Sequence, residues 1–441
     1  MQICLIRKCL TVSQSKNPER QRLIAIDHQY VAPAGRVSKF DLVVDHGKGA
    51  KVWDVDGNVY IDFLASASAV NVGHSNPKVV AAIHNQTDKL IHYISGYFYH
   101  EPAIKLAKRL ALLAPGKTPK KVSFSTSGSE AAEAVVKFAR SYTKRSVILT
   151  FQNSWHGTTL GAASLSAIDG NMHRDIGPLI PDIHHIPFPN PDKRFPGESL
   201  ADFSKRYLKE LTDLFTRDIP ADQIAAILIE PIQGDAGIIM PPISYMQGLY
   251  KICHENGILF CTDEINQGFG RSGKMWSIDH FNLEPDLMAV GKSLASGMPL
   301  SAIIGKAPIM DSLASPANAT TTAANPICCA AALATIDEIE SLDLVERSRK
   351  LGEFSKTQFS KLQKEFPVIK HVRMIGLNGG IEFAEDQSQL VTNLCNYCFE
   401  HGLIVISTMD HIIRFQPPLV ITKAELTKGI GILHDGLTNL V

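Results

Sequence analysis

The sequence is poor in cysteine, with 8 among 441 residues, which argues against a disulfide-stabilised secreted protein. Two of them, Cys328 and Cys329, are adjacent. Cys395 and Cys398 form a lone Cys-x-x-Cys pair, and no second Cys or His pair at zinc spacing accompanies it. We therefore predict two buried thiols on one helix face, no metal site, and a reducing cytoplasmic location.

Long apolar runs are also missing. The most apolar stretch, AAILIEPIQGDAGIIM, is interrupted by Glu230, Gln233 and Asp235, so it falls short of the roughly 18 apolar residues that a membrane helix needs. The N-terminal MQICLIRKCLTV contains Arg7 and Lys8, and no small-residue cleavage site follows it. We expect neither a membrane span nor a signal peptide.

Net charge is absent as well, because 44 Lys and Arg residues balance 44 Asp and Glu residues. Proteins that bind nucleic acid or anionic membranes usually carry an excess of positive charge. The chain is 45% hydrophobic and 20% charged, as in ordinary globular proteins, and its length allows two or three domains. Small molecules are therefore the expected ligands.

Hydrophobic patterning divides the chain into three parts. Residues 49–63 alternate apolar and polar around Asp56 and Gly57, which is typical of a β-hairpin. From about residue 100, helices alternate with short apolar strands, which predicts a parallel α/β sheet. The predicted units are an N-terminal segment over residues 1–77 that contributes to a small domain, a large domain over 78–325, and a C-terminal small α+β domain over 326–441.

One candidate binding element is the sequence FSTSGSEAAEAVVKFAR, where a predicted strand runs through Ser127, Gly128 and Ser129 into a helix. Free backbone N–H groups and the helix dipole favour an anion there, and the glycine allows close approach. A phosphate group is the expected ligand. The alternative is an ordinary serine cap at the start of a helix.

A second candidate element combines Asp263, at the end of the apolar strand ILFCTDE, with Lys292 in DLMAVGK, 29 residues later. Ligands of parallel sheets bind where strands end. A lysine there can form a Schiff base with an aldehyde, and a carboxylate can hold a pyridinium nitrogen protonated. Each residue alone could be a surface charge, but together with a phosphate loop they suggest pyridoxal phosphate.

From about residue 35 to 441, the chain resembles the class III aminotransferases of the fold type I pyridoxal-phosphate enzymes. DEINQGFGRSG and DLMAVGKSLASG are similar to that family's cofactor-attachment signature. The resemblance implies an α/β fold with a mostly parallel central sheet in the large domain. It also implies that Lys292 carries pyridoxal 5′-phosphate as a Schiff base.

The resemblance further implies how the cofactor ring is held. Asp263 would pair with the pyridinium nitrogen. Ile265 would pack on one ring face, and Trp155, in SWHGTT, would stack on the other. Asn266 stands where the family usually has Gln near the ring oxygen.

The same resemblance assigns the ring's phosphate and the substrate. Gly128 and Ser129 match the family's phosphate loop, and Thr321 matches a threonine that reaches the phosphate from a neighbouring subunit. A homodimer or a dimer of dimers with shared active sites is implied. Arg414, in IIRFQPPL, matches the arginine that binds the substrate α-carboxylate. Without the resemblance, Arg414 would be interpreted as part of a surface ion pair.

Two departures from the aminotransferase pattern bear on the reaction. In 4-aminobutyrate-type enzymes an arginine commonly follows aromatic-His-Gly, but Thr158 stands there. Asp235, in EPIQGDAG, could approach the α-carbon opposite Lys292, although it could also merely cap a turn. With FLASASAVNVGH and MIGLNGGIE, these features are similar to a racemase and epimerase branch of the family that acts on non-polar branched-chain amino acids such as isoleucine.

The sequence therefore predicts an amino-acid racemase or epimerase in which Lys292 and Asp235 divide the two proton transfers. An ω-aminotransferase of the 4-aminobutyrate or ornithine type is the alternative, and it would require a keto-acid acceptor. A binding or scaffold protein is a third interpretation. It is disfavoured because Lys292, Asp263 and Arg414 are all present.

Overall fold

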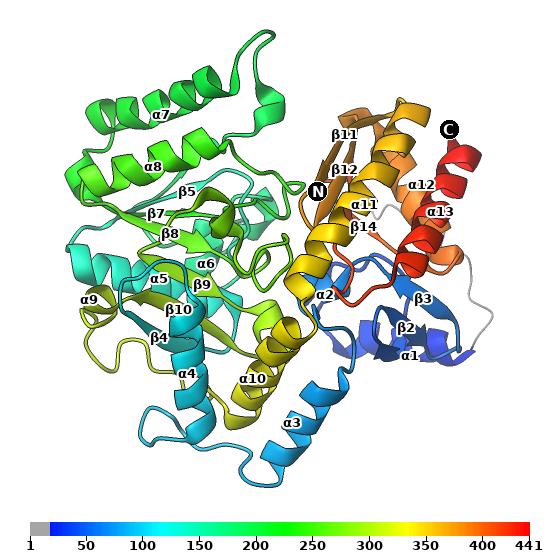
Figure 1. Cartoon of the computed structure of the whole chain (residues 1–441), viewed down its shortest axis with the longest axis horizontal. Coiled ribbons are helices and arrows are strands. Elements are labelled where there is room, and N and C mark those ends of the chain that lie inside the picture. Colours follow the sequence, from blue (N-terminus) through cyan, green and yellow to red (C-terminus); the bar gives the residue numbers. More distant parts are fainter. Residues whose placement is uncertain (1–17) are drawn as a thin grey trace, which may run out of the picture.

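The computed structural model describes residues 18–441, so the expectation about a signal peptide lies outside the described residues. Figure 1 shows a larger part built around one sheet and a smaller part that carries both the first strands and the last helices of the chain. Helices α10 (Pro326–Ser341) and α11 (Leu344–Glu365) lead from the larger to the smaller part.

The larger part contains a seven-stranded sheet in the order β4-β10-β9-β8-β7-β5-β6. Only β10 runs antiparallel to its neighbours, which confirms the predicted mostly parallel sheet. Four of its strands consist entirely of buried residues, as expected for a parallel sheet covered on both faces. The strands are β4 (Lys120–Ser125), β5 (Val147–Phe151), β6 (Ile183–Ile186), β7 (Ile224–Ile229), β8 (Leu259–Asp263), β9 (Leu287–Val290) and β10 (Ser301–Lys306).

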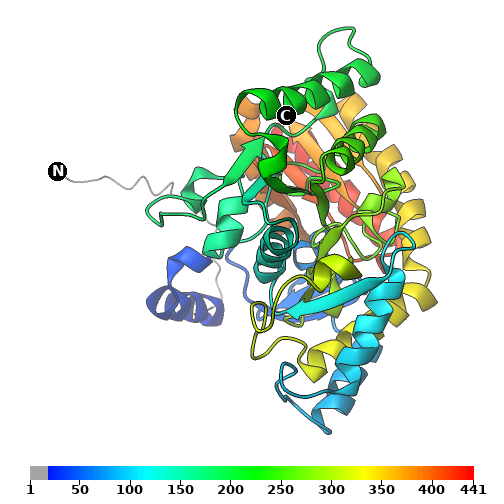
Figure 2. The same cartoon turned by 90° about the vertical axis from the view of Figure 1, so that its left-hand side faces the viewer.

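Helices cover both faces of this sheet (Figures 1 and 2). One of them, α5, presents an alanine-rich buried face that lets it approach the strands closely. The helices of this part are α4 (Glu101–Leu113), α5 (Gly128–Thr143), α6 (Leu160–Leu165), α7 (Leu200–Arg217), α8 (Ile243–Glu255) and α9 (Ala307–Met310). The first helices of the chain are α1 (Pro18–Tyr30), the short α2 (Ala65–Ser68) and α3 (Pro77–Thr87).

The smaller part joins the two ends of the chain through β-sheet pairing. The predicted hairpin is formed by β2 (Lys51–Asp54) and β3 (Val59–Asp62), and β13 (Leu403–Ile404) pairs in parallel with β3. A strand near the C-terminus thus lies beside the hairpin near the start of the described chain. The remaining strands are β1 (Val44–Lys48), β11 (Ile369–Met374), β12 (Gly379–Phe383), β14 (Ile406–Thr408) and β15 (Ile412–Phe415).

A second sheet of this part has the order β11-β12-β15-β14 and is antiparallel throughout. Helices α12 (Ser388–Glu400) and α13 (Lys423–Leu440) pack beside it. Cys395 and Cys398 are both buried on α12, as predicted. Within residues 18–441, no helix is long and apolar enough to cross a membrane, and no group of His, Cys, Asp and Glu side chains is arranged to hold a metal ion.

Candidate active site

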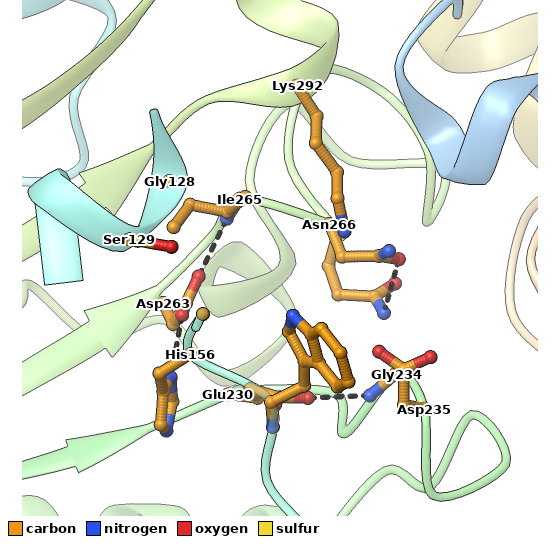
Figure 3. A pocket seen from close by; sticks show the side chains of 13 residues that line it. Gly128, Ser129, His156, Glu230, Gly234, Asp235, Asp263, Ile265, Asn266 and Lys292 are labelled. Carbon is orange, nitrogen blue, oxygen red and sulfur yellow. Dashed lines mark hydrogen bonds and ion pairs between the residues drawn. The ribbon is translucent and has the colours of Figure 1, made fainter. Parts of the chain in front are cut away.

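A cavity of about 630 Å³, including its open mouth, lies where β7, β8 and β9 end. Parallel strands deliver their last side chains to the same edge of a sheet, and this edge is where α/β folds bind ligands. The cavity brings together eight of the residues predicted from the sequence (Figure 3). These are Gly128, Ser129, Trp155, Asp235, Asp263, Ile265, Asn266 and Lys292.

The first turn of α5 forms one end of the cavity. Ser127 caps the helix by accepting a hydrogen bond from the Glu130 N–H. The N–H groups of Gly128 and Ser129 lie in the first turn, where backbone donors have no partner within the helix. The Ser129 hydroxyl accepts a hydrogen bond from the Thr158 N–H at 3.2 Å. Donors and the positive end of the helix dipole thus converge at one point, which suits a phosphate group.

Asp263 ends β8 and points into the cavity as a buried carboxylate (Figure 3). One of its oxygens lies 2.7 Å from His156 Nδ1, and the other accepts a hydrogen bond from the Ile265 N–H at 2.9 Å. Burial alone would lower the pKa of His156, but the hydrogen bond and charge of Asp263 outweigh it and raise that pKa. The imidazole therefore supports Asp263 as an anion that can hold a protonated ring nitrogen.

Ile265, two residues after Asp263, gives this part of the cavity an apolar wall. A Cβ atom at Gly128 would come within 3.2 Å of Ile265, so the absence of a side chain at Gly128 keeps this side open. Trp155 is 39% exposed at the cavity and is held through its backbone N–H, which donates to Glu230 at 2.8 Å. An aromatic ring is well suited to this space.

Lys292 follows β9 and Gly291, and its backbone is in the left-handed region with φ of 44°. Its partly buried side chain extends into the cavity from the side opposite Asp235 in the view of Figure 3. Burial lowers the pKa of the Lys292 amine, and the charge of Arg414 lowers it further, against the opposing effect of Asp235. A lysine with a lowered pKa can act as a nucleophile and as a base.

Asp235 and Arg414 form an ion pair at the mouth of the cavity. Arg414 lies in β15 and is almost completely buried, whereas the Asp235 side chain is 25% exposed. Burial raises the pKa of Asp235, but the charges of Arg414 and Lys292 and the hydrogen bond from Arg414 together outweigh it, so the pKa lies below its ordinary value. The Asp235 carboxylate is therefore paired with the guanidinium of Arg414. By the sequence resemblance, the same guanidinium would bind the α-carboxylate of the substrate.

Glu230 was not among the predicted site residues, although its place at the end of β7 was a signal that could have identified it. Its carboxylate accepts hydrogen bonds from the N–H groups of Trp155 and Gly234, at 2.8 and 2.6 Å. Burial raises the pKa of Glu230 to about 7. Glu230 thus joins the loop that carries Trp155 to the turn that carries Asp235. His156, which follows Trp155 directly, was missed in the same way.

Thr321 lies outside the cavity lining and is exposed, so within this chain it is not brought to the other predicted residues. It is located in the loop between α9 and α10. The predicted contact of Thr321 with a phosphate requires a neighbouring subunit. This contact stays a prediction.

Comparison with known proteins identifies the family. Residues 32–437 match the family described as Aminotransferase class-III. The chain belongs to this family. Its cofactor is therefore pyridoxal 5′-phosphate and its fold is type I, as predicted. The ornithine aminotransferase of Toxoplasma gondii has a similar structure, with a TM-score of 0.84, 27% identity and 96% of each chain covered.

The sequence relatives of this class III chain include racemases and an epimerase. The isoleucine 2-epimerase of Lentilactobacillus buchneri is 50% identical over 430 residues, which cover 96% of each chain. The leucine/methionine racemase of Thermococcus litoralis is 38% identical, with 92% of this chain and 93% of that protein covered.

The residues of the cavity fit pyridoxal 5′-phosphate. The α5 N-terminus offers donors for the phosphate, and the carboxylate of Asp263 suits the ring nitrogen. The Asn266 amide nitrogen is buried without a hydrogen-bond partner, so it has a donor to offer to a ligand. Lys292 lies within the same cavity.

Proposed function

We propose that this chain inverts the α-carbon of non-polar branched-chain amino acids, converting L-isoleucine to D-allo-isoleucine. The observation that carries the proposal is the placement of two proton-transfer groups, Lys292 and Asp235, on opposite sides of one cavity. The 50% identity to an isoleucine 2-epimerase over nearly the whole chain supports it.

The proton transfers divide between the two faces of the substrate. Bound pyridoxal 5′-phosphate withdraws electrons from the α-carbon and makes its C–H bond acidic. Lys292 then removes or returns the proton on one face, since burial lowers the pKa of its amine toward neutrality. Asp235 does the same on the other face, so a proton taken from one side is replaced from the other.

The ion pair between Asp235 and Arg414 decides when Asp235 is able to act. A carboxylate paired with arginine holds a proton weakly, and the lowered pKa of Asp235 reflects this. The α-carboxylate of a substrate is a bidentate partner for the same guanidinium. On binding it displaces Asp235, whose pKa then rises because burial remains while the paired charge is lost.

An aminotransferase reaction with an acidic keto acid needs a second cationic group for the distal carboxylate. Among the described residues, no arginine lines the cavity. Thr158 occupies the position after aromatic-His-Gly where 4-aminobutyrate-type enzymes commonly have an arginine. Arg373 lies on β11, which β12 separates from the strand of Arg414, and it is paired with Asp192 and Glu382. A distal carboxylate would therefore be left without a partner, which is costly.

Chiral analysis tests the proposed function directly. In deuterated water without any keto acid, L-isoleucine should yield D-allo-isoleucine with deuterium at the α-carbon and an unchanged side-chain centre. Addition of 2-oxoglutarate should yield little glutamate. Efficient glutamate formation, with no inverted product when keto acid is omitted, would establish an aminotransferase instead.

We also propose that the chain acts as a homodimer or a dimer of dimers through an aromatic segment, residues 90–99. Its side chains are unusually exposed, including Tyr97 at 76%, Phe98 at 53% and Tyr99 at 94%. Contiguous apolar surface of this kind marks association sites. Ser95 donates to the Ala323 carbonyl, which ties the segment to the loop of Thr321. A second copy docked here would bring Thr321 to its partner's phosphate site.

A further inference from the structure

Four side-chain amides form a closed ring of hydrogen bonds behind the cavity, and we name Asn266, Gln267, Asn378 and Gln416 the amide ring. Gln267 donates to the Asn266 oxygen at 3.0 Å, and Gln416 donates to the same oxygen at 2.8 Å. Gln416 also donates to the Asn378 oxygen at 2.8 Å, and Asn378 donates to Gln267. Each member therefore has at least two partners within the ring.

The amide ring joins the two parts of the molecule. Asn266 and Gln267 follow β8, whereas Asn378 precedes β12 and Gln416 follows β15. Three of its members are completely buried, and Asn266 lines the cavity. Gln416 lies two residues after Arg414, immediately after the last residue of β15.

The ring determines which end of the Asn266 amide faces the cavity. Its oxygen accepts two hydrogen bonds, which leaves its buried nitrogen without a partner. Turning Asn266 alone would place its N–H groups against those of Gln267 and Gln416. An amide can reverse its role only if all four reverse together, so the orientation of Asn266 is a collective property.

We propose that Gln416 is a positioning residue that, through the amide ring, holds the Asn266 amide nitrogen toward the ring oxygen of the cofactor. This inference rests on the cofactor placement that the family resemblance implies, with Asn266 near the ring oxygen. The residue that presents a donor to the cofactor is thereby linked to the end of β15, which also carries the carboxylate-binding Arg414. No charged group is needed, because neutral amides hold the ring together and leave only the Asn266 nitrogen and the Gln416 oxygen without a partner.

The expected consequence is visible in the absorbance of the holoenzyme. A donor to the ring oxygen stabilises its anionic form, and this lowers the pH at which the cofactor's visible band changes. Gln416→Met removes both donors of Gln416 at nearly constant volume and leaves only Gln267 to hold the orientation of Asn266. The pH midpoint of the absorbance change should rise by about 0.5 to 1 unit, the worth of one hydrogen bond.

A double-mutant cycle separates this role from a merely structural one. In an Asn266→Leu background, Gln416→Met should produce no further shift of the midpoint, because the residue that it orients is gone. An effect through Arg414 would persist in that background and would overturn the inference. Asn378→Leu breaks the ring at another member and should shift the midpoint in the same direction, so the inference does not depend on the folding of one variant.

Gln233→Met is the matched control, because Gln233 is also a buried glutamine beside the cavity but bonds to the Gln152 carbonyl, outside the ring. It should leave the midpoint unchanged. If Gln416→Met and Asn378→Leu both keep the original midpoint, the inference is wrong. That result would leave the proposed function intact, since inversion of L-isoleucine by the unchanged protein is measured separately.

Discussion

At the scale of single residues, the charged side chains of the cavity influence one another's pKa and are held by specific hydrogen bonds. Lys292 and Asp235 influence each other's pKa, and Arg414 acts on both. His156 supports the charge of Asp263, while Glu230 is held by two backbone N–H groups. Substitution of one group should therefore alter a defined property of its neighbours.

Lys292 is the predicted attachment point of the cofactor. Lys292→Ala should lose both the visible colour and the racemisation, because no other amine lines the cavity among the described residues. Borohydride reduction followed by peptide mapping should place the pyridoxyl group on Lys292 in the unchanged protein. A label on another lysine would contradict the assignment.

Asp235 should matter for proton transfer and not for cofactor binding. Asp235→Asn keeps the volume but removes the acid, so racemisation should fall by about 10² to 10⁴, the usual contribution of a positioned proton-transfer group. The visible spectrum should persist. Asp192→Asn, at a carboxylate paired with Arg373, is the control and should retain most activity. Unchanged racemisation in Asp235→Asn would reduce this residue to a turn former.

Glu230 should make the stability of the apoprotein depend on pH. Its folded pKa, about 7, lies above the ordinary value of 4.5, so the folded state binds this proton more tightly than the unfolded state. The resulting stabilisation is complete below about pH 4.5 and is lost as the pH rises through 7. Its upper limit is about 3 kcal/mol for a shift of this size.

The measurement is the free energy of unfolding in urea between pH 5 and 8. Glu230→Gln has no ionisable group at this position, so it should lose less stability than the unchanged protein as the pH rises. Parallel curves for the two proteins would show that Glu230 titrates as an ordinary carboxyl.

At the scale of elements, the turn over residues 234–238 is placed by the antiparallel sheet of the smaller part. Arg373, Gly380 and Arg414 lie opposite one another on β11, β12 and β15. Arg373 donates to the Gly237 carbonyl at 3.0 Å. A Cβ atom at Gly380 would lie 2.4 Å from the same carbonyl oxygen. The absence of a side chain in the middle strand thus lets the turn approach and brings Asp235 to Arg414.

Gly380→Ala should displace this turn. We expect a loss of about 1 to 3 kcal/mol in the free energy of unfolding, as for other overpacked sites, together with weaker racemisation. Gly431→Ala in α13 is the control, since a Cβ atom there meets nothing within 4 Å, and it should be neutral or stabilising by up to about 1 kcal/mol. Unchanged stability and activity in Gly380→Ala would show that the turn is placed by other contacts.

At the scale of the whole molecule, we propose that a second copy of the chain completes the active site. The double substitution Tyr97→Glu and Phe98→Glu places two charges in the aromatic segment and should dissociate the assembly in sedimentation experiments. Cofactor affinity should fall at the same time, because Thr321 of the neighbouring copy is withdrawn. Tyr142→Glu, at an exposed tyrosine on α5, should change neither property. A monomeric variant with unchanged cofactor affinity would contradict the shared site.

The sequence by itself determined those features that depend on local pattern. Strand β8 and the strand before Lys292 were predictable because continuous apolar runs end in a polar residue, and the carboxyl ends of parallel strands meet at one edge. The α5 N-terminus was predictable from Ser127 and Gly128 for the same local reason. The family then followed from two motifs around Asp263 and Lys292.

Only the tertiary structure decided which of these residues are partners. Asp235 and Arg414 are 179 positions apart, and Asn378 and Gln267 are 111 apart. Neither the ion pair nor the amide ring has a local signal, because both form where the loops after β7 and β8 meet the smaller part of the molecule. The bridging role of Glu230 was hidden likewise, since its two partners are backbone N–H groups whose positions depend on how the loops pack.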